Sequence, residues 1–489
     1  MFAKLTLLVN EPRLRARFDR WYIAGILAIA AVLRLWNLGY PRALVFDETY
    51  YVKDALTLSM TGVERNWPNE ANPAFEAGEY TGYLDTGSFV VHPPLGKWII
   101  AAGMWLFGPG NPFGWRFSVA VLSIAAVALV MLITRKLTSS TVWSALAGFL
   151  FAIDGLAIVM GRTGLLDGIL MFFVLFAFWF LLLDRERDFG ALWHRPWLIA
   201  AGLSLGAATA VKWSGLYFLA AVGIYVVVTE ISFDDGEIDL LKFAKQALAK
   251  FVLLVPTAFV VYLLSWTGWL NTTQGYDRGW ADKSGNEWSG FFAWIPTSLQ
   301  SLWHYHVEAY NFHVGLRTPH SYQSNPLTWL FLTRPTSFFY QGYDNGTHGC
   351  VAESGCSSAI TALGNPIIWI TALAAVLFLI YLFIARRDKA AGFLLLGVAA
   401  GYLPWMLYLQ RTVFQFYVIA FEPFMIMALV YAMAWIWRNS HERRRLVLAG
   451  FATIAFASLA FSLFFLNIWL GTWTPYWYWY LHMWIPSWI

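Results

Sequence analysis

Long apolar stretches that carry almost no charge constrain the fold of this chain more than any other feature of its sequence. A helix of about 20 apolar residues crosses the roughly 30 Å hydrocarbon core of a bilayer. Only 13% of the residues are charged, about half the proportion found in soluble domains. We therefore predict an all-α polytopic membrane protein with about eleven spans, at residues 21–38, 113–134, 141–160, 165–183, 196–211, 213–229, 251–269, 364–385, 390–409, 412–437 and 446–470.

Lys and Arg residues concentrate in alternate connections between the predicted spans. Six segments hold 20 of the 33 basic residues: 1–20, 135–136, 185–195, 242–250, 386–389 and 438–445. With eleven spans, all six fall on one side of the membrane, which the positive-inside rule identifies as cytoplasmic. The N-terminus is then cytoplasmic and the C-terminus external. The net charge of only +4, spread over many short connections, argues against a nucleic-acid partner.

This topology divides the chain into five regions. The two longest connections are both external, and long loops commonly carry functional residues. The tail has eight Trp or Tyr in nineteen residues, a composition typical of membrane–water interfaces. The regions are a cytoplasmic tail (1–20), an N-terminal transmembrane module (21–269) whose external loop 39–112 is expected to carry the catalysis, a second external loop (270–363), C-terminal transmembrane helices (364–470) and an external aromatic interfacial tail (471–489).

An acidic pair follows the first predicted span. Asp47 and Glu48 come nine and ten residues after its end, so we expect them close to the outer membrane surface, where lipid phosphates lie. A carboxylate at this place can act as general base on a hydroxyl nucleophile. A solvated loop pair without function is the common alternative, and the polar residues predicted nearby favour the catalytic interpretation.

Several charged residues are predicted at the outer ends of spans. Each alone fits a side chain that anchors a helix at the interface, and Arg162 with Asp167 fits equally a structural ion pair. Several cations on the face that carries Asp47 also fit a phosphate-bearing donor, because cations hold its charge and stabilise the leaving group. We predict four donor phosphate-binding residues: Arg116, Arg162, Lys212 and Arg411.

Polar and aromatic residues in the second external loop are candidates for contact with the substrate. Hydrogen-bonding groups and stacking surface of this kind hold sugars or peptides, although a well-packed loop with helix caps has the same composition. The predicted substrate or acceptor residues are His320, Tyr322, Ser324, Trp329 and, from the transmembrane module, Asp167. Cys350 and Cys356, outside the cytoplasm, can form a disulfide, and a metal site is not expected from two Cys at this spacing.

Eight short blocks, in order along nearly the whole chain, resemble the protein O-mannosyltransferases. They are FDETYYVKDA after the first span, HPPLGKW at 92–98, RFSVA from Arg116, RTGLLDGILMFF at 162–173, KWSGLYF from Lys212, HSYQSNPLTW from His320, GNPIIW at 364–369 and RTVFQFY from Arg411. Each block is common by itself, and the ordered set on an eleven-span layout is specific.

The resemblance implies a GT-C type glycosyltransferase fold and a polyprenyl-phosphate-mannose donor. It implies inverting transfer of mannose to Ser/Thr hydroxyls of secreted or membrane proteins during or after translocation, with the translocon as a possible partner. Asp47 would be the catalytic base with Glu48 beside it, and Arg116 would match the family's important second-span arginine. Eukaryotic relatives insert a β-trefoil domain into the second long loop, which here has only about 94 residues. The chain therefore resembles a bacterial, actinobacterial-type member in the plasma membrane with an external active site.

Other functions remain open at the level of sequence. A related GT-C enzyme could act on a lipid or cell-wall glycan acceptor with the same donor side. A secondary transporter is disfavoured, because it would place ionisable residues near mid-bilayer, and a membrane scaffold would leave the external charges without a role. No cofactor is required by the sequence, and a divalent cation at the carboxylates is compatible with it.

Overall fold

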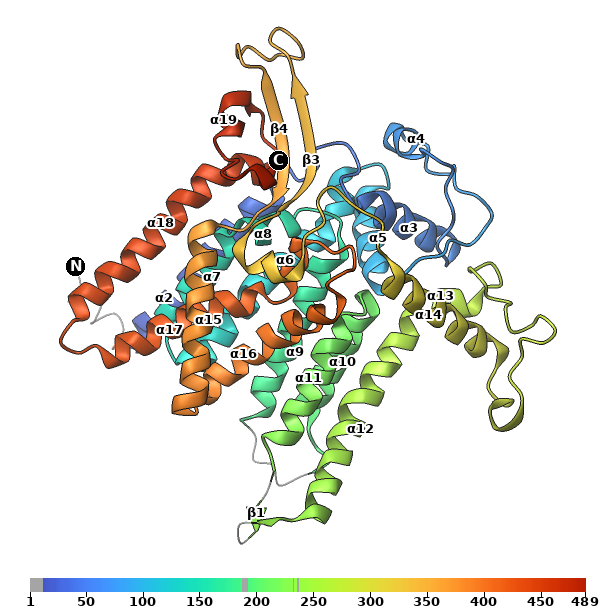
Figure 1. Cartoon of the computed structure of the whole chain (residues 1–489), viewed down its shortest axis with the longest axis horizontal. Coiled ribbons are helices and arrows are strands. Elements are labelled where there is room, and N and C mark those ends of the chain that lie inside the picture. Colours follow the sequence, from blue (N-terminus) through green and yellow to red (C-terminus); the bar gives the residue numbers. More distant parts are fainter. Residues whose placement is uncertain (1–11, 187–191, 232, 235–236) are drawn as a thin grey trace.

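The described part of the chain is a helical body whose helices overlap all eleven predicted spans (Figure 1). The structure is a computed structural model that describes residues 12–186, 192–231, 233–234 and 237–489. Residues 1–11 of the predicted tail lie outside this description. The helices at the predicted spans are α2 (Pro12–Leu35), α6 (Pro112–Thr138), α7 (Thr141–Ile153) with α8 (Gly155–Met160), α9 (Leu166–Asp184), α10 (Pro196–Val211), α11 (Gly215–Val228), α12 (Leu240–Ser265), α15 (Pro366–Arg386), α16 (Lys389–Tyr402), α17 (Glu422–Asn439) and α18 (Arg444–Leu470).

The lengths and compositions of these helices support a multi-pass membrane protein. Among the described residues, six helices are long and apolar enough to cross a membrane: α6, α9, α12, α15, α16 with its continuation to Tyr408, and α18. Four further apolar helical segments at predicted spans are shorter: Trp21–Leu35 of α2, and the helices α7, α10 and α11. α17 forms the centre of the body, since all its residues from Glu422 to Ala434 are buried.

Asn-Pro pairs start several of the helical segments. The side chain of Asn111 accepts a hydrogen bond from the backbone N–H of Phe113 at the start of α6, and Asn365 does the same for Ile367 and Ile368 at α15. Asn is a preferred N-cap, and Pro fits the first helical turn because that turn's N–H groups lack partners within the helix. These local signals fix the N-terminal ends of α6 and α15.

The boundaries of two predicted spans differ from those of the helices in the structure. The predicted helix at 141–160 breaks at Asp154, whose Oδ1 accepts from the backbone N–H of Leu156 at 2.8 Å and so caps α8. The predicted start of the tenth span at 412 is wrong, because α17 begins at Glu422 and the preceding residues form the short 3-10 helix η4 (Gln415–Ala420). Pro423 explains the late start, because proline does not continue a preceding helix. Arg411 therefore lies in a loop.

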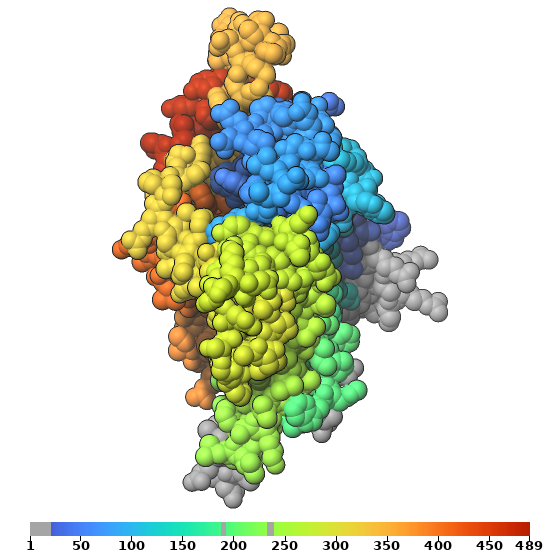
Figure 2. Space-filling view, turned by 90° about the vertical axis from the view of Figure 1, so that its right-hand side faces the viewer, coloured from blue at the N-terminus to red at the C-terminus, as the bar shows by residue number. Residues whose placement is uncertain are grey.

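The first predicted external loop, residues 39–112, contains three helices: α3 (Glu48–Thr61), α4 (Asn72–Ala77) and α5 (Leu95–Phe107). Lys97 of α5 forms a buried ion pair with Glu64, in the stretch that follows α3. The end of this loop reaches the second external loop, where the hydroxyl of Tyr305 accepts from the N–H of Val90 at 2.9 Å. Figure 2 shows the surfaces of the two loops side by side on one face of the molecule.

The second external loop and the C-terminal tail together form a small antiparallel sheet, which the all-α prediction missed. The loop holds α13 (Thr267–Asn271), η1 (Gly290–Phe292), α14 (Thr297–Gly315), η2 (Pro326–Phe331), β3 (Thr336–Tyr343) and β4 (Cys356–Ala362), and the tail holds β5 (Thr474–Pro475), α19 (Tyr476–Tyr480) and η5 (Pro486–Trp488). The strand order is β3-β4-β5. Aromatic and β-branched residues favour strands; β3 contains both kinds and β4 contains the β-branched Ile360 and Thr361.

A disulfide joins Cys350 to Cys356 between β3 and β4. In Figure 1 this hairpin lies at the end of the molecule that also holds the C-terminus. The opposite end carries a two-stranded pair, β1 (Phe233–Asp234) with β2 (Glu237–Ile238). The described part of the predicted tail also differs from expectation, because Pro12 onward belongs to α2.

Candidate active site

Asp47 lies at the start of α3 on a constrained piece of backbone. Phe46, directly before it, has a φ of 47°, a left-handed conformation that is unusual for a bulky residue and tends to occur at functional sites. The Phe46 ring is held by the rings of Phe338 at 4.9 Å and Phe414 at 5.4 Å between centroids. The Asp47 side chain does not cap α3, so its carboxylate remains available to other groups.

The environment of Asp47 raises its pKa to about 6, chiefly through burial. The positive charge of Lys212 and the hydrogen bond from Tyr51 lower this pKa, whereas the negative charge of Asp167 raises it. Burial destabilises the charged form of a carboxyl group. An acid of this kind can ionise and accept a proton near neutral pH, as a general base must.

Glu48 has a structural position, which corrects its prediction as a catalytic residue. Its side chain is fully buried, and its Oε1 and Oε2 accept from Nε and Nη2 of Arg116, each at 2.7 Å. The backbone N–H groups of Gly164 and Val45 donate to the same carboxylate at 2.7 and 3.0 Å. With four donors already bound, Glu48 has no free lone pair positioned toward a substrate.

Arg116 is not placed to bind a phosphate, contrary to prediction. Besides Glu48, its guanidinium donates to the backbone carbonyls of Leu38, Pro41 and Ala43 at 3.0–3.2 Å. The side chain is only 1% exposed. Its five N–H groups are thus all used within the protein, and they hold the segment between α2 and α3 that carries Asp47.

The guanidinium of Arg162 likewise binds the protein backbone rather than a ligand. It donates to the carbonyls of Leu33, Arg34, Trp36 and Asn37 at 2.8–3.4 Å. These carbonyls belong to the C-terminal end of α2 and the turn after it, where backbone acceptors lack helical partners. Arg162 therefore caps α2, and the alternative that it pairs with Asp167 is not what the structure shows.

Asp167 pairs with Lys212 instead. The Lys212 ammonium lies 2.8 Å from Oδ1 and 3.1 Å from Oδ2 of Asp167, and both side chains are buried. The same ammonium lies 4.0 Å from the ring centre of Tyr417, a cation–π contact. This pair of α9 and α10 stands beside Asp47, since the charges of Lys212 and Asp167 both act on its carboxyl group.

Arg411 approaches the same place from the loop before η4. Its Nη2 lies 2.9 Å from Nδ1 of His313 on α14, and its buried Nε has no hydrogen-bond partner among the described residues. A cavity of about 180 Å³ is lined by Lys212, His313, Arg411 and His92. An unused buried N–H on a cation beside a cavity indicates a place for an anionic ligand.

Two histidines that the sequence interpretation did not assign belong to this cavity. The rings of His92 and His313 lie 5.2 Å apart. Burial, with the positive charge of Lys212, lowers the pKa of His92 well below its usual value, and burial with the charge of Arg411 lowers the pKa of His313 to about 4. Both are therefore neutral near pH 7. The block HPPLGKW pointed to His92, whereas no sequence signal pointed to His313.

The predicted substrate residues of the second loop separate into two pairs. Ser324 and Trp329 are buried against each other, with Trp329 Nε1 donating to Ser324 Oγ at 2.9 Å, so neither is available to a sugar or peptide. His320 is exposed, and its ring contacts Phe46 at 5.9 Å between centroids. Tyr322 lies next to His320, 6.2 Å away between ring centroids. The structure therefore places His320 against Phe46, the residue before Asp47, with Tyr322 beside His320, and it buries the other two.

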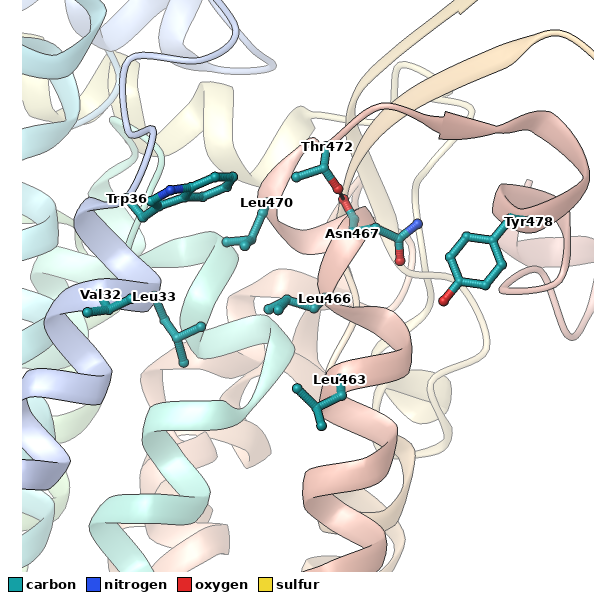
Figure 3. Close-up of a pocket in the computed structure, with 9 residues that line it drawn as sticks. All are labelled: Val32, Leu33, Trp36, Leu463, Leu466, Asn467, Leu470, Thr472 and Tyr478. Carbon is teal, nitrogen blue, oxygen red and sulfur yellow. Dashed lines mark hydrogen bonds between the residues drawn. The ribbon is translucent and has the colours of Figure 1, made fainter. Parts of the chain in front are cut away.

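A different cavity lies between α2 and α18 (Figure 3). It has a volume of about 470 Å³ and is lined mainly by apolar side chains such as Leu33 and Leu466. Among the described residues, no acidic or basic side chain lines it. This cavity therefore offers neither a carboxylate for proton transfer nor a cation for a phosphate.

Comparisons with known proteins identify the family. A family model described as dolichyl-phosphate-mannose-protein mannosyltransferase matches residues 75–274, and one described as the C-terminal four TMM region of protein-O-mannosyltransferase matches residues 298–488. A Mycolicibacterium smegmatis protein named polyprenol-phosphate-mannose–protein mannosyltransferase is 33% identical over 473 residues, which cover 90% of this chain and 87% of that protein. This chain belongs to the protein O-mannosyltransferase family.

Further relatives confirm the predicted actinobacterial type of this O-mannosyltransferase family member. A Corynebacterium glutamicum protein with the same name is 31% identical over an alignment that covers 96% of this chain and 94% of that protein. The Saccharomyces cerevisiae Pmt1-Pmt2 complex bound to the sugar donor matches the fold with a TM-score of 0.73 at 17% identity, over 100% of this chain and 94% of that one. ArnT from Cupriavidus metallidurans bound to undecaprenyl phosphate matches with a TM-score of 0.52 at 15% identity, over 92% and 71%. The predicted GT-C fold is confirmed.

Proposed function

We propose that this chain transfers mannose from polyprenyl-phosphate-mannose to Ser/Thr hydroxyls of secreted or membrane proteins. The observation that carries the proposal is Asp47, whose pKa is raised to about 6 and whose carboxyl group feels the charge of Lys212; Lys212 in turn lines a cavity together with Arg411. One acid that can accept a proton and two cations that can hold a phosphate are the groups that the reaction needs. The names of the relatives from two actinobacteria support the choice of donor and acceptor.

The donor would place its phosphate between Arg411 and Lys212. Arg411 has an unused buried N–H, whereas Lys212 shares its charge with Asp167, so we assign the stronger contact to Arg411. An apolar cavity of about 780 Å³ between α11 and α12 shares Leu216 with the cavity at Lys212. We assign the polyprenyl tail to this apolar cavity, because burial of its methylene groups is favourable.

The chemical step would be a single inverting displacement. Asp47 accepts the proton of the acceptor hydroxyl as its oxygen bonds to C1 of mannose, and the bond from C1 to the phosphate oxygen breaks. The polyprenyl phosphate leaves as an anion that Arg411 and Lys212 stabilise, so the leaving group needs no proton. Because these cations already supply positive charge, the proposed step requires no divalent cation.

The acceptor polypeptide would reach Asp47 past His320 and Tyr322. Both residues lie on the external loop, and His320 contacts the Phe46 ring directly before Asp47 in the chain. An extended, unfolded segment presents its hydroxyls better than a folded surface does, which fits an acceptor modified during or after translocation. The translocon is a reasonable partner for this reason.

The function is tested by supplying both substrates to the purified protein. Incubation with polyprenyl-phosphate-mannose and a Ser/Thr-rich peptide is expected to increase the peptide mass by one hexose, as measured by mass spectrometry. A peptide with every Ser and Thr replaced by Ala serves as the control. Transfer to a lipid or cell-wall glycan, with none to the peptide, would instead favour a glycan-modifying enzyme.

We propose further that the protein lies in the plasma membrane with the site on the external face. The charge asymmetry of the connections supports this orientation. In intact cells, Ser284→Cys in the second predicted external loop is expected to react with a membrane-impermeant maleimide, and Asn439→Cys at the end of α17 is expected to react only after lysis. Both positions are exposed. The reverse pattern would contradict the proposed topology.

A further inference from the structure

A His and two carboxylates come together in the second external loop, away from the proposed active site. His304 and Glu308 are four residues apart on α14 and so share one helix face, and Asp277 faces them from the loop after α13. One potential ligand atom from each residue lies within 4.8 Å of the other two. None of these residues takes part in the proposed mannosyl transfer.

The distances between these atoms are close to those of a metal site. Nε2 of His304 lies 3.4 Å from Oε1 of Glu308 and 3.8 Å from Oδ2 of Asp277. Ligands bound at about 2.0–2.1 Å to a tetrahedral zinc ion stand about 3.3 Å apart. Small side-chain rotations would therefore be enough to bring the three atoms around one ion.

The surroundings leave these ligand atoms available and aligned. The ring of Trp280 stacks on His304 at 4.0 Å between centroids and 7° between planes, which fixes the orientation of the imidazole. Oε2 of Glu308, the oxygen other than the one 3.4 Å from His304, is buried without a hydrogen-bond partner among the described residues, and the Glu308 side chain also hydrogen-bonds with that of Tyr276. Lys283 lies 3.8 Å from the other oxygen of Asp277, Oδ1, and its side chain is 64% exposed, so it does not occupy the Oδ2 that faces His304.

We propose that Asp277, His304 and Glu308 bind one divalent cation, best matched by Zn²⁺. One imidazole and two carboxylates suit zinc, whereas Mg²⁺ and Ca²⁺ favour all-oxygen sites. Three protein ligands leave a fourth position for water.

The ion would be structural. His304 stands nine residues before His313 on α14, about 14 Å along the helix axis, so the ion is remote from the donor cavity. The ion would join the long connection between α13 and α14 to the face of α14. This connection already touches α14 through the hydrogen bond from the Ala281 N–H to Ser301 Oγ at 3.0 Å. A metal cross-link at Asp277 would restrain the loop further.

The test is zinc binding by the full-length protein in detergent, after removal of its affinity tag and of bound metals with a chelator. Isothermal titration with ZnCl₂ is expected to give one site per chain, and zinc is expected to raise the thermal unfolding temperature. His304→Ala and the nearly isosteric Glu308→Gln should each weaken binding at least about 100-fold, because loss of even an outer-shell partner costs 10- to 100-fold. His348→Ala, at an exposed histidine near the β3–β4 turn, is the matched control.

Binding of zinc with equal affinity by wild-type protein and His304→Ala would overturn the proposal, as would the absence of binding to wild-type protein. Equal affinity for Mg²⁺ would also overturn it, because the imidazole would then contribute nothing. If one variant misfolds, the other and the Mg²⁺ comparison still decide the outcome. The measurement needs no sugar donor, so its result is independent of whether the chain transfers mannose.

Discussion

Replacing Asp47 with asparagine is expected to reduce kcat/KM for mannosyl transfer by about 10²–10⁴-fold, the usual contribution of a positioned general base. Asparagine keeps the size of the side chain and removes its capacity to take a proton. The rate is measured with purified protein, polyprenyl-phosphate-mannose and a Ser/Thr-rich peptide. Asp85→Asn, at an exposed position of the same external loop, is the isosteric control and should leave the rate within about twofold of wild type, because surface substitutions of this kind have small effects.

The pH dependence of the same reaction separates a base from a residue that merely holds the loop. The pKa of Asp47 is raised to about 6 by burial, and a base acts only in its ionised form. We therefore expect kcat/KM of the wild type to fall about tenfold per pH unit below pH 6 and to level off above it. In Asp47→Asn the residual rate should lose this dependence. An unchanged pH profile in the variant would exclude Asp47 as the base.

Removing Arg116 is expected to cause the second large effect, on stability. Arg116→Ala leaves the fully buried Glu48 without its ion partner, and breaking such a pair by removal of one member typically costs about 3–5 kcal/mol. The free energy of unfolding in detergent should fall by this amount. Arg42→Ala, at an exposed arginine on the same segment, should have almost no effect on stability.

The double replacement Arg116→Met with Glu48→Gln distinguishes the two roles considered for Arg116. Because it removes both charges, it should recover part of the stability lost in Arg116→Ala. If Arg116 bound the donor phosphate directly, the double variant would recover stability and would still show a much higher KM for the donor than the wild-type protein. Normal stability of Arg116→Ala with weak donor binding would restore the original phosphate-binding prediction.

The fold could be predicted largely from the sequence, because the apolar runs and the charges between them follow from the bilayer itself. All eleven predicted spans overlap helices. The predictions were poorest where local chemistry overrides hydropathy. Asp154 interrupts a continuous apolar run because its carboxylate caps a new helix, and Pro423 delays α17. The addition of β5 to the β3–β4 hairpin depends on pairing between residues more than 110 positions apart, such as Ser357 and Thr474, which a local pattern does not reveal.

The sequence predicted which residues lie at the candidate site better than it predicted what each of them does. Placement at span ends located Asp47, Lys212 and Arg411, which the structure brings together. The same placement could not tell a cation with free donors from one whose donors are all used, as in Arg116 and Arg162. That distinction depends on backbone carbonyls contributed by the segment between α2 and α3, and the orientation of carbonyls has no signature in the sequence.

The break between α7 and α8 has a consequence for biosynthesis. Asp154 satisfies one carboxylate oxygen within its own turn, but the other accepts from the backbone N–H of Asn365, 211 residues later in the chain. At about 5–20 residues per second, roughly 10–40 s of synthesis separate the two residues. During that time one carboxylate oxygen of Asp154 lacks its hydrogen-bond partner, the N–H of Asn365, inside a partly synthesised membrane protein. We therefore expect the insertion machinery, or water that reaches Asp154, to stabilise this carboxylate until α15 has been synthesised and has packed against it.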